Sequence, residues 1–335
     1  MSRDDVLLKV EELSVDYQVE GAGFFSPQQS LRAVSGVSFE VCAGETVGVV
    51  GESGCGKSSL GRALIKLVAS SQGKITWRGR RIDQLPEREF RDIRRDLQMI
   101  FQDPLASLNP RMTVASIIAE PLQVFLDAQS REEVRERVLK VMDAVGLPAR
   151  LQNRFPHEFS GGQAQRIGIA RAIVSNPKFI VCDEPVSALD VSIQAQIINL
   201  LMKLKKEMGL TLLFISHDLA VVHHLADKIL VLYLGKVVEF GDAKLLSEQP
   251  LHPYTQMLYS AMPIADPIKA RRQRRVKPVG EPPSPLNPPS GCVFHTRCPQ
   301  AVERCKREIP ALRPLHGREI ACHLIEEQSW GTGTL

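Results

Sequence analysis

The chain has 335 residues, which predicts one principal domain of about 200 to 250 residues and a smaller appendage. Hydrophobic residues make up 44% of the sequence and charged residues 24%, a composition that excludes a mainly disordered or collagen-like protein. The 42 Lys and Arg side chains nearly balance the 38 Asp and Glu side chains, so net charge alone does not indicate a nucleic-acid-binding protein.

Signals for membrane insertion and export are weak in this sequence. The longest apolar runs, such as Ile229 to Leu234, fall far short of the roughly 18 residues that a membrane-spanning helix needs. Residues Met1 to Asp5 carry acids where a signal peptide carries bases. We therefore expect a cytoplasmic address, where the seven cysteines serve as thiols or metal ligands rather than as disulfides.

Over the first two thirds of the chain, short apolar runs alternate with longer helical patterns. This alternation predicts an α/β fold with a mainly parallel core sheet. Three runs have the continuous apolar character of strands covered on both faces: Thr46 to Val50, Phe179 to Cys182 and Thr211 to Ile215. Polar residues follow each run, and chemistry gathers at the carboxyl ends of such strands.

The first strand leads into a glycine-rich segment that matches the pattern G-x-x-x-x-G-K-[ST]. Such a loop supplies several backbone N–H groups and the positive end of a helix dipole to phosphate oxygens. We expect Lys57 to reach the β and γ phosphates, Ser58 to offer its hydroxyl to Mg²⁺ and Ser59 to donate to the α phosphate. A helical pattern over Ser59 to Val68 favours this interpretation over a chance glycine-rich turn. The predicted ligands are Gly51, Glu52, Ser53, Gly54, Cys55, Gly56, Lys57, Ser58 and Ser59.

Two adjacent acids end the second strand. We expect Asp183 to hold Mg²⁺ through water and Glu184 to polarise the attacking water. An apolar run that ends in two acids is weak evidence alone, because many strands end in a polar turn. Combined with the phosphate loop, it predicts a nucleotide hydrolase.

About 130 residues separate the first two strands, far more than one crossover helix needs, so we expect an inserted helical subdomain over about 103–175. Ser130 and Glu133 form a capping-box pattern before a helix that stops near Gly146. A second helix is expected from near Gly162. A third follows Asp190, and Gly209 ends it.

The segment Phe159 to Gln165 reads FSGGQAQ and resembles the signature motif of ATP-binding cassette (ABC) ATPases, usually LSGGQ. By itself, the segment could equally be an ordinary helix N-cap. The other cassette elements follow in the expected order: Gln102 as the Q-loop, Ser187 to Asp190 as the D-loop, and His217 as the switch histidine. The resemblance implies an ABC nucleotide-binding domain with a parallel core sheet, an antiparallel β edge and a helical subdomain.

The same resemblance implies roles for single residues. Gln102 should contact Mg²⁺ and the attacking water, and His217 should hydrogen-bond the γ phosphate, so that Gln102, Glu184 and His217 form the catalytic set. Tyr17 should stack on adenine, although core packing is the alternative for an aromatic residue in an N-terminal strand. Cassettes work as head-to-tail pairs, so the signature motif should act on ATP bound by a partner. Its residues are Ser160, Gly161, Gly162 and Gln163.

The last third resembles the C-terminal extension of the ATPase subunits of dipeptide and oligopeptide permeases. Residues His252 to Thr255 read HPYT, and Gly280 to Leu286 reads GEPPSPL, as in that family. The resemblance implies an ABC ATPase domain over 1–250 and the extension over 251–335. It implies ATP hydrolysis that drives peptide import, with nickel or glutathione as related solutes. A soluble ABC ATPase acting on DNA or ribosomes is the rival, although the second cassette or long coiled coil usual in those proteins is absent from the sequence. A regulatory module without turnover is the third alternative, which the intact catalytic residues disfavour.

Four cysteines lie in the last 45 residues, with five, six and sixteen residues between successive members. Four thiols in a cytosolic protein indicate a metal, but the tight C-x₂-C pairs of Cys₄ zinc sites are absent from the sequence. The peptide-importer resemblance implies a [4Fe-4S] cluster, with Zn²⁺ and unligated thiols as alternatives. The candidate ligands are Cys292, Cys298, Cys305 and Cys322.

The importer resemblance also implies partners. These are a second ABC ATPase subunit as heterodimer partner, two transmembrane permease subunits and, indirectly, a periplasmic or extracellular peptide-binding protein. We expect no nucleic acid and a peripheral location on the cytoplasmic face of the inner membrane. A basic run over 269–277 is expected to be a solvated connector, with anionic lipid or nucleic acid as alternative contacts.

Overall fold

The computed structural model describes residues 6–19, 29–125, 130–262 and 279–327. They divide into two compact units, each assembled from segments far apart in the sequence. The first unit comprises Met1–Leu8, Glu40–Thr46 and Thr76–Ser216, and the second comprises Lys9–Phe39, Val47–Ile75 and His217–Leu335. The predicted boundary near residue 250 remains a prediction, and the basic run over 269–277 lies outside the described residues.

Three parallel strands form the centre of the first unit. In spatial order they are β6 (Leu97–Ile100), β7 (Phe179–Asp183) and β8 (Thr211–Ile215). Every residue of β7 and β8 is buried, as their unbroken apolar sequences predict for strands covered on both faces. The predicted second and third strands are therefore confirmed. A short strand, β5 (Arg80–Arg81), pairs with Thr76 and Trp77.

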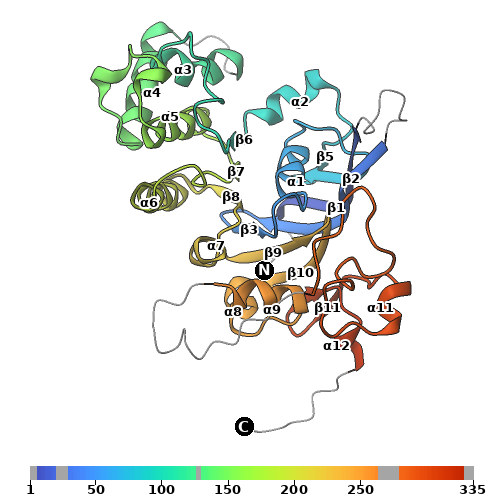
Figure 1. The fold of residues 1–335 in the computed structure, drawn as a ribbon. Helices are drawn as coiled ribbons and strands as arrows, with labels where there is room; N and C mark the ends of the chain where they lie inside the picture. Colours follow the sequence, from blue (N-terminus) through green and yellow to red (C-terminus); the bar gives the residue numbers. More distant parts are fainter. Residues whose placement is uncertain (1–5, 20–28, 126–129, 263–278, 328–335) are drawn as a thin grey trace, which may run out of the picture. The chain divides into compact units, whose positions relative to one another are not determined.

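Helices make up most of the remaining first unit. They are α2 (Glu87–Arg94), α3 (Val114–Phe125), α4 (Arg131–Ala144), α5 (Gly161–Ile173) and α6 (Val191–Met208), with short 3₁₀ turns at Ala149–Leu151 and Pro156–Glu158. Helices α3, α4 and α5 pack on one another and form the green cluster in Figure 1. The helical subdomain expected over about 103–175 remains a prediction.

The predicted helix boundaries follow from local capping chemistry. The Ser130 side chain accepts from the backbone N–H of Glu133, and the Glu133 carboxylate accepts in return from the N–H of Ser130. Helix α6 begins after its N-cap Asp190 and ends at Gly209, which has a φ of 64°. The predicted positions of α4, α5 and α6 are confirmed to within a residue or two.

The second unit contains two groups of strands. Strands β11 (Arg313–Leu315), β12 (Arg318–Ile320), β10 (Lys236–Asp242), β9 (Lys228–Tyr233) and β3 (Thr46–Val50) lie side by side in that order. Strands β3 and β9 pair in parallel. The pairs β9–β10, β10–β12 and β12–β11 are antiparallel. Strands β2 (Gln29–Cys42), β1 (Val6–Val19) and β4 (Gln72–Trp77) neighbour one another in a second sheet. Two strands from beyond residue 310 thus extend a sheet begun near residue 46.

The helices of the second unit are short. They are α1 (Lys57–Leu64), α7 (Leu219–Leu225), α8 (Ala243–Glu248), α9 (Pro253–Ser260), α11 (Glu303–Arg307) and α12 (Leu324–Glu327). The expectation that the helix after the phosphate loop continues to Val68 is wrong, because α1 ends at Leu64. Lys66 has a φ of 54°, a left-handed conformation that a continuing helix cannot accommodate.

An aromatic cluster connects the C-terminal extension to the rest of the second unit. The rings of Tyr233 and Tyr254 lie 4.7 Å apart, and Phe294 lies 5.2 Å from Tyr233 and 5.3 Å from Tyr254. All three side chains are almost completely buried. Buried aromatic contacts of this kind each add to the stability that area burial supplies, so the extension is firmly packed against β9.

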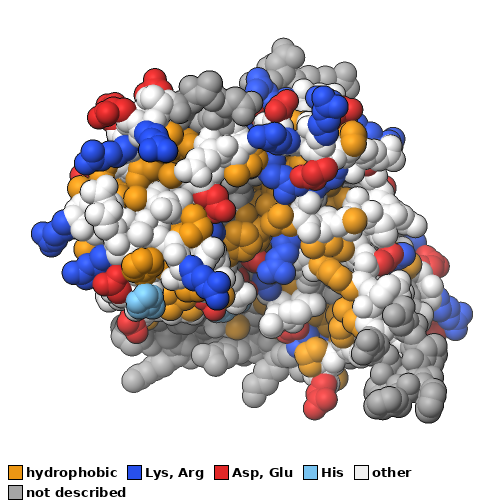
Figure 2. All heavy atoms as spheres, turned by 90° about the horizontal axis from the view of Figure 1, so that it is seen from above, with side chains coloured by type: hydrophobic (Ala, Val, Ile, Leu, Met, Phe, Trp, Pro, Cys, Tyr) orange, Lys and Arg blue, Asp and Glu red, His pale blue; other side chains and the backbone are white. Residues whose placement is uncertain are grey.

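Charged side chains of both signs alternate on the molecular face drawn in Figure 2, with apolar side chains between them. Among the residues that the structure describes, none of the helices combines the length and apolar character that crossing a bilayer requires.

Candidate nucleotide-binding site

The predicted phosphate loop lies between β3 and α1, the arrangement that such a loop needs. Gly56 is the N-cap of α1 and has a φ of 103°, a conformation that residues with a side chain avoid. A Cβ atom at this position would also run into the carbonyl oxygen of Ala33. Glycine is therefore required here by backbone conformation and by space, independently of any ligand.

Lys57 is the first residue of α1 and its side chain is buried. Its Nζ atom donates hydrogen bonds to the carbonyl oxygens of Gly51, at 2.8 Å, and Glu52, at 3.0 Å. A buried ammonium group, the N-terminal end of α1 and the loop amides thus gather in one small volume. This concentration of positive potential suits phosphate oxygens.

Tyr17 and Ser59 meet beside the loop. The Tyr17 hydroxyl donates a hydrogen bond of 3.2 Å to the Ser59 hydroxyl, so a half-buried ring from β1 lies against the start of α1. The structure thereby places the predicted adenine-stacking residue next to the predicted phosphate ligands within the second unit. Its stacking role remains a prediction.

In the first unit, Asp183 is the last residue of β7 and Glu184 follows it directly, as expected. The Asp183 side chain is completely buried, whereas Glu184 is half-buried. Glu184 has a φ of 44°, and non-glycine residues held in this left-handed region cluster at functional sites. The Gln102 side chain, just beyond β6, donates a hydrogen bond of 3.1 Å from Nε2 to the Glu184 carboxylate. The structure therefore brings together the predicted Q-loop glutamine and the predicted general base.

The signature segment forms the N-terminus of α5. Ser160 is the N-cap and shares a capping box with Gln163, and both side chains are exposed. A Cβ atom on Gly162 would lie 2.6 Å from the Ile193 side chain on α6. Close packing of two helices therefore explains one glycine of the motif, and the phosphate-binding role of the segment remains a prediction.

The switch histidine comes shortly after β8, which ends at Ile215. His217 is exposed and directly precedes Asp218, the N-cap of α7. His217, Tyr17 and the phosphate loop belong to the second unit, and Gln102, Asp183, Glu184 and the signature segment belong to the first.

The predicted magnesium ligands are chemically suitable. Mg²⁺ is a hard cation that prefers oxygen donors and is usually bound by one or two carboxylates together with substrate phosphates. Asp183 supplies a buried carboxylate, Ser58 a hydroxyl at the start of α1, and Gln102 an amide oxygen. Each of these side chains thus offers an oxygen of the kind that Mg²⁺ prefers.

The four C-terminal cysteines lie in one small module, and none of them is disulfide-bonded in the part of the chain that the structure describes. The backbone N–H of Cys292 donates to the carbonyl of Cys305 at 2.8 Å. Burial raises the pKa of Cys292 to about 11 and that of Cys322 to about 12, with smaller effects from the neighbouring cysteines. Nevertheless, the described residues contain no group of three or more His, Cys, Asp or Glu arranged to hold a metal ion. The expected ligand set is therefore not formed.

Two residues that contact the phosphate loop were not assigned to the site from the sequence. The Tyr254 hydroxyl accepts a hydrogen bond of 2.8 Å from the backbone N–H of Glu52, and Arg297 forms an ion pair with the Glu52 carboxylate at 2.7 Å. Tyr254 belongs to the HPYT segment and Arg297 precedes Cys298. Local sequence contains no signal for contacts across so many residues.

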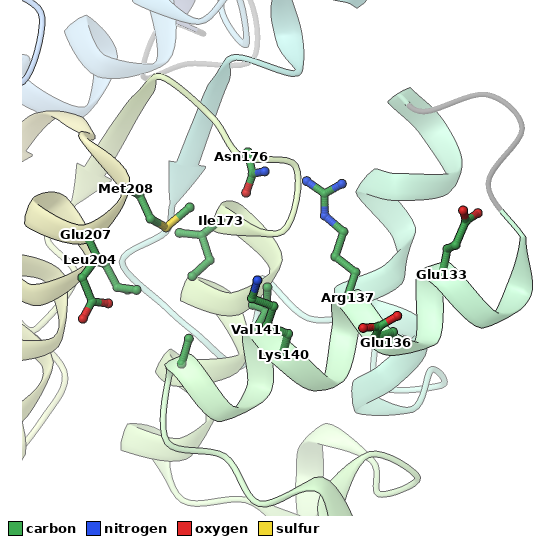
Figure 3. Close-up of a pocket in the computed structure, with 11 residues that line it drawn as sticks. Glu133, Glu136, Arg137, Lys140, Val141, Ile173, Asn176, Leu204, Glu207 and Met208 are labelled. Atoms are coloured by element: carbon green, nitrogen blue, oxygen red, sulfur yellow. The ribbon is translucent and has the colours of Figure 1, made fainter.

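The first unit also contains a cavity of about 620 Å³. Figure 3 shows that it is lined by side chains of α4 on one side and of α6 on the other, including Arg137, Lys140, Val141, Leu204, Glu207 and Met208. Burial lowers the pKa of Arg137, and the charge of Arg95 adds to this effect. None of the predicted nucleotide ligands lines this cavity, and its charges of both signs specify no single class of ligand.

Comparison with protein families gives two matches along the chain. Residues 34–187 match the family described as ABC transporter. Residues 238–305 match the family described as oligopeptide/dipeptide transporter, C-terminal region.

Relatives match over nearly the whole length of the chain. The oligopeptide transport ATP-binding protein OppF of Salmonella typhimurium is 54% identical over 323 residues, which cover 96% of this chain and 97% of that protein. The di/tripeptide transport ATP-binding protein DppF of Pseudomonas aeruginosa is 49% identical over 96% of this chain and 99% of its own length. Among solved structures, the ATP-binding cassette MJ0796 in a post-hydrolysis dimer bound to ADP and Pi superposes with a TM-score of 0.63 at 30% identity, covering 71% of this chain and 99% of that one.

Proposed function

Because the chain belongs to the family of ABC transporter ATP-binding proteins with the oligopeptide/dipeptide C-terminal region, we propose that it powers peptide import by hydrolysing ATP at the site described above. The fold is that of an ABC ATPase, and the chain is an ATPase subunit of a peptide importer. The expectations of family, fold class and enzyme class are thus confirmed.

The hydrogen bond between Gln102 and Glu184 is the observation that most supports hydrolysis rather than binding alone. A carboxylate held at a strand end is a suitable general base for water, and an amide within hydrogen-bonding distance can orient that same water. Lys57 and the loop amides would bind the phosphates, and His217 would hydrogen-bond the γ phosphate. Ser58, Asp183 and Gln102 would hold Mg²⁺, which would supply positive charge against the phosphates.

A reconstituted importer tests this proposal. The chain is recovered from membranes with its permease subunits, and ATPase activity is measured with and without peptide and a peptide-binding protein. Stimulation by both additions supports the importer function. Lys57→Ala should abolish the stabilisation of the chain by MgATP in a thermal melt, whereas Lys244→Ala on α8 should not.

Beyond the ATPase activity itself, we propose a specific assembly. Permease subunits and a substrate-binding protein are implied by membership of an importer family, and a second, different ATPase subunit would complete a heterodimer. Ser160 to Gln163 would then face ATP bound by that second subunit. The chain would lie peripherally on the cytoplasmic face of the membrane. Copurification of two distinct ATPase chains in equal amounts supports the heterodimer, and copurification of this chain alone contradicts it.

The names of the relatives indicate peptides as the transported solute, and a direct test distinguishes peptides from the related solutes nickel and glutathione. Stimulation of the reconstituted ATPase by di- or oligopeptides, but not by Ni²⁺ or glutathione with their own binding proteins, distinguishes the three. Full activity without any membrane partner would instead favour the soluble ABC ATPase.

A metal at the cysteine module is proposed on donor chemistry alone. Four thiols in a buried module suit a [4Fe-4S] cluster, with Zn²⁺ as the alternative, although the described side chains do not form a ligand set. A cluster would have a structural or sensory role. Protein purified without oxygen should be brown and contain about four irons and four sulfides per chain. A colourless preparation with stoichiometric zinc supports the alternative, and no bound metal contradicts both.

A further inference from the structure

The phosphate loop carries a negative charge of its own. Glu52 is the second residue of the loop, between Gly51 and the glycines that precede Lys57, and its side chain is 32% exposed. A carboxylate at this position would repel the phosphates of a bound nucleotide unless another group compensates its charge. The structure supplies that compensation from outside the ABC ATPase sequence pattern.

Arg297, from the C-terminal extension, forms a bidentate ion pair with this carboxylate through both of its terminal nitrogens. The two hydrogen bonds are 2.7 Å and 3.0 Å long, and the Arg297 side chain is only 5% exposed. The phenol of Tyr233 accepts a further hydrogen bond of 3.4 Å from the same guanidinium group. Paired, two-pronged geometry of this kind fixes the direction of the carboxylate as well as neutralising it.

The backbone of Glu52 is also held by a residue beyond position 250. Its N–H donates to the Tyr254 hydroxyl at 2.8 Å, and Tyr254 is completely buried against Tyr233 and Phe294. Both the side chain and the main chain of one loop residue are therefore fixed by residues beyond 250. The contacts span 245 and 202 residues of sequence, respectively.

We propose that Arg297 is a positioning residue of the nucleotide site, which holds Glu52 turned away from bound phosphate and cancels its charge. This inference rests on the proposed nucleotide site and adds to it a requirement for the C-terminal extension. The extension completes the phosphate loop, so a chain without it would carry a loop with an uncompensated acid. MgATP affinity is the property that this arrangement controls.

Titration of the purified full-length chain with MgATP tests the proposal. Arg297→Met should weaken MgATP binding by about tenfold, because the Glu52 charge is then uncompensated near the phosphates. Glu52→Gln alone is the reference for the double variant, and Arg297→Met should cost much less affinity in that background than in the unaltered chain. The double variant should recover most of the lost affinity, a rescue that general destabilisation would not produce.

Two further arginine variants separate positioning from stability. Arg318 forms a second ion pair of the extension, with Glu239 at 3.0 Å, and this pair is fully buried. Arg318→Met should lower the melting temperature yet leave MgATP affinity unchanged at temperatures where the protein is folded. Arg297→Lys keeps the charge but loses the two-pronged geometry, and should weaken binding by about threefold.

The outcomes are distinct. Unchanged affinity in both Arg297 variants overturns the proposal, as does equal loss of affinity in Arg297→Met and Arg318→Met, or failure of Glu52→Gln to rescue. If Arg297→Met does not fold, Arg297→Lys with and without Glu52→Gln decides the question in the same way. Failure of the unaltered chain to bind MgATP overturns the nucleotide site itself rather than the role of Arg297.

Discussion

Glu184 combines a left-handed backbone conformation with a hydrogen bond from Gln102, so both its backbone and its carboxylate are held in place. Residues kept in such a conformation cost free energy, and the cost is tolerated where the side chain has a task. Asp183 beside it is buried and therefore has a different environment, in keeping with the different roles predicted for the two acids. At this scale, single substitutions should separate binding from chemistry.

Glu184→Gln should retain MgATP binding and reduce turnover on the order of a hundredfold or more, because an amide keeps the shape but cannot act as a base. Steady-state hydrolysis and nucleotide binding are measured on the same assembled complex. Glu248→Gln, at an exposed position of α8, is the matched control and should hydrolyse normally. Near-normal turnover by the Glu184 variant would remove this residue from the catalytic set.

His252 gives a prediction about pH. It is the N-cap of α9, its Nδ1 accepts from the Tyr254 N–H, and burial lowers its pKa from 6.5 to about 3. The unfolded chain takes up this proton near pH 6.5 and the folded chain only near pH 3. The neutral residue's contribution to stability is therefore complete above about pH 6.5 and is lost progressively as the pH falls towards 3.

His252→Asn should flatten that dependence, because asparagine can cap the helix but does not titrate. Between pH 6 and pH 4.5 the unaltered protein should lose up to about 1.4 kcal/mol per pH unit more unfolding free energy than the variant. Denaturant unfolding at several pH values measures the difference. Exposed His224→Asn is the control, and an identical pH slope in His252→Asn and the unaltered chain would contradict the prediction.

At the scale of single elements, helix α5 combines a predicted functional segment with close packing against other helices. Its N-terminus carries the signature segment, while its body packs on α3, α4 and α6. Two of its glycines differ in surroundings: Gly162 is crowded by Ile193, whereas a Cβ atom on Gly168 would meet nothing within 4 Å. The same substitution at these two positions should therefore have opposite effects.

Gly168→Ala should stabilise the protein by about 0.5 to 1 kcal/mol, because alanine removes the entropic cost of glycine inside a helix. Gly162→Ala should destabilise it, because the new methyl group would lie 2.6 Å from the Ile193 side chain. Denaturant midpoints measure both. Ile193→Ala should relieve the crowding in the Gly162→Ala background, and a stabilised Gly162→Ala single variant would show that α5 and α6 are not packed this closely.

For the whole molecule, the proposed assembly makes activity depend on partners. The isolated chain should bind MgATP but hydrolyse it slowly, because the signature segment of another subunit is needed beside its own phosphate loop. Addition of the sister ATPase and the permease subunits should raise the rate. Rapid hydrolysis by the chain alone would favour the soluble ATPase.

Contact with the permease should occur near Gln102. The segment Asp103 to Arg111 follows it directly and leads towards α3, and several of its residues are exposed. Photocrosslinkers introduced there should label cytoplasmic loops of the permease subunits, whereas crosslinkers on α11 should not. Labelling confined to α11 would place the membrane partner elsewhere.

Much of the site is local in sequence, and for that reason the sequence alone determined it. Several features each depend on a few consecutive residues whose backbone chemistry favours one local structure. They are the phosphate loop, the two acids at the end of β7, and the caps at Ser130, Ser160 and Asp190. Their order along the chain was enough to indicate the family, which the comparisons show.

Tertiary structure alone decided what depends on residues far apart. The grip of Arg297 on Glu52 spans 245 residues, and the left-handed backbone of Glu184 has no signature in its neighbours. The early end of α1 and the unformed ligand set of the four cysteines belong to the same class. Such features arise when packing of the whole chain outweighs local preference, and local pattern contains no measure of that balance.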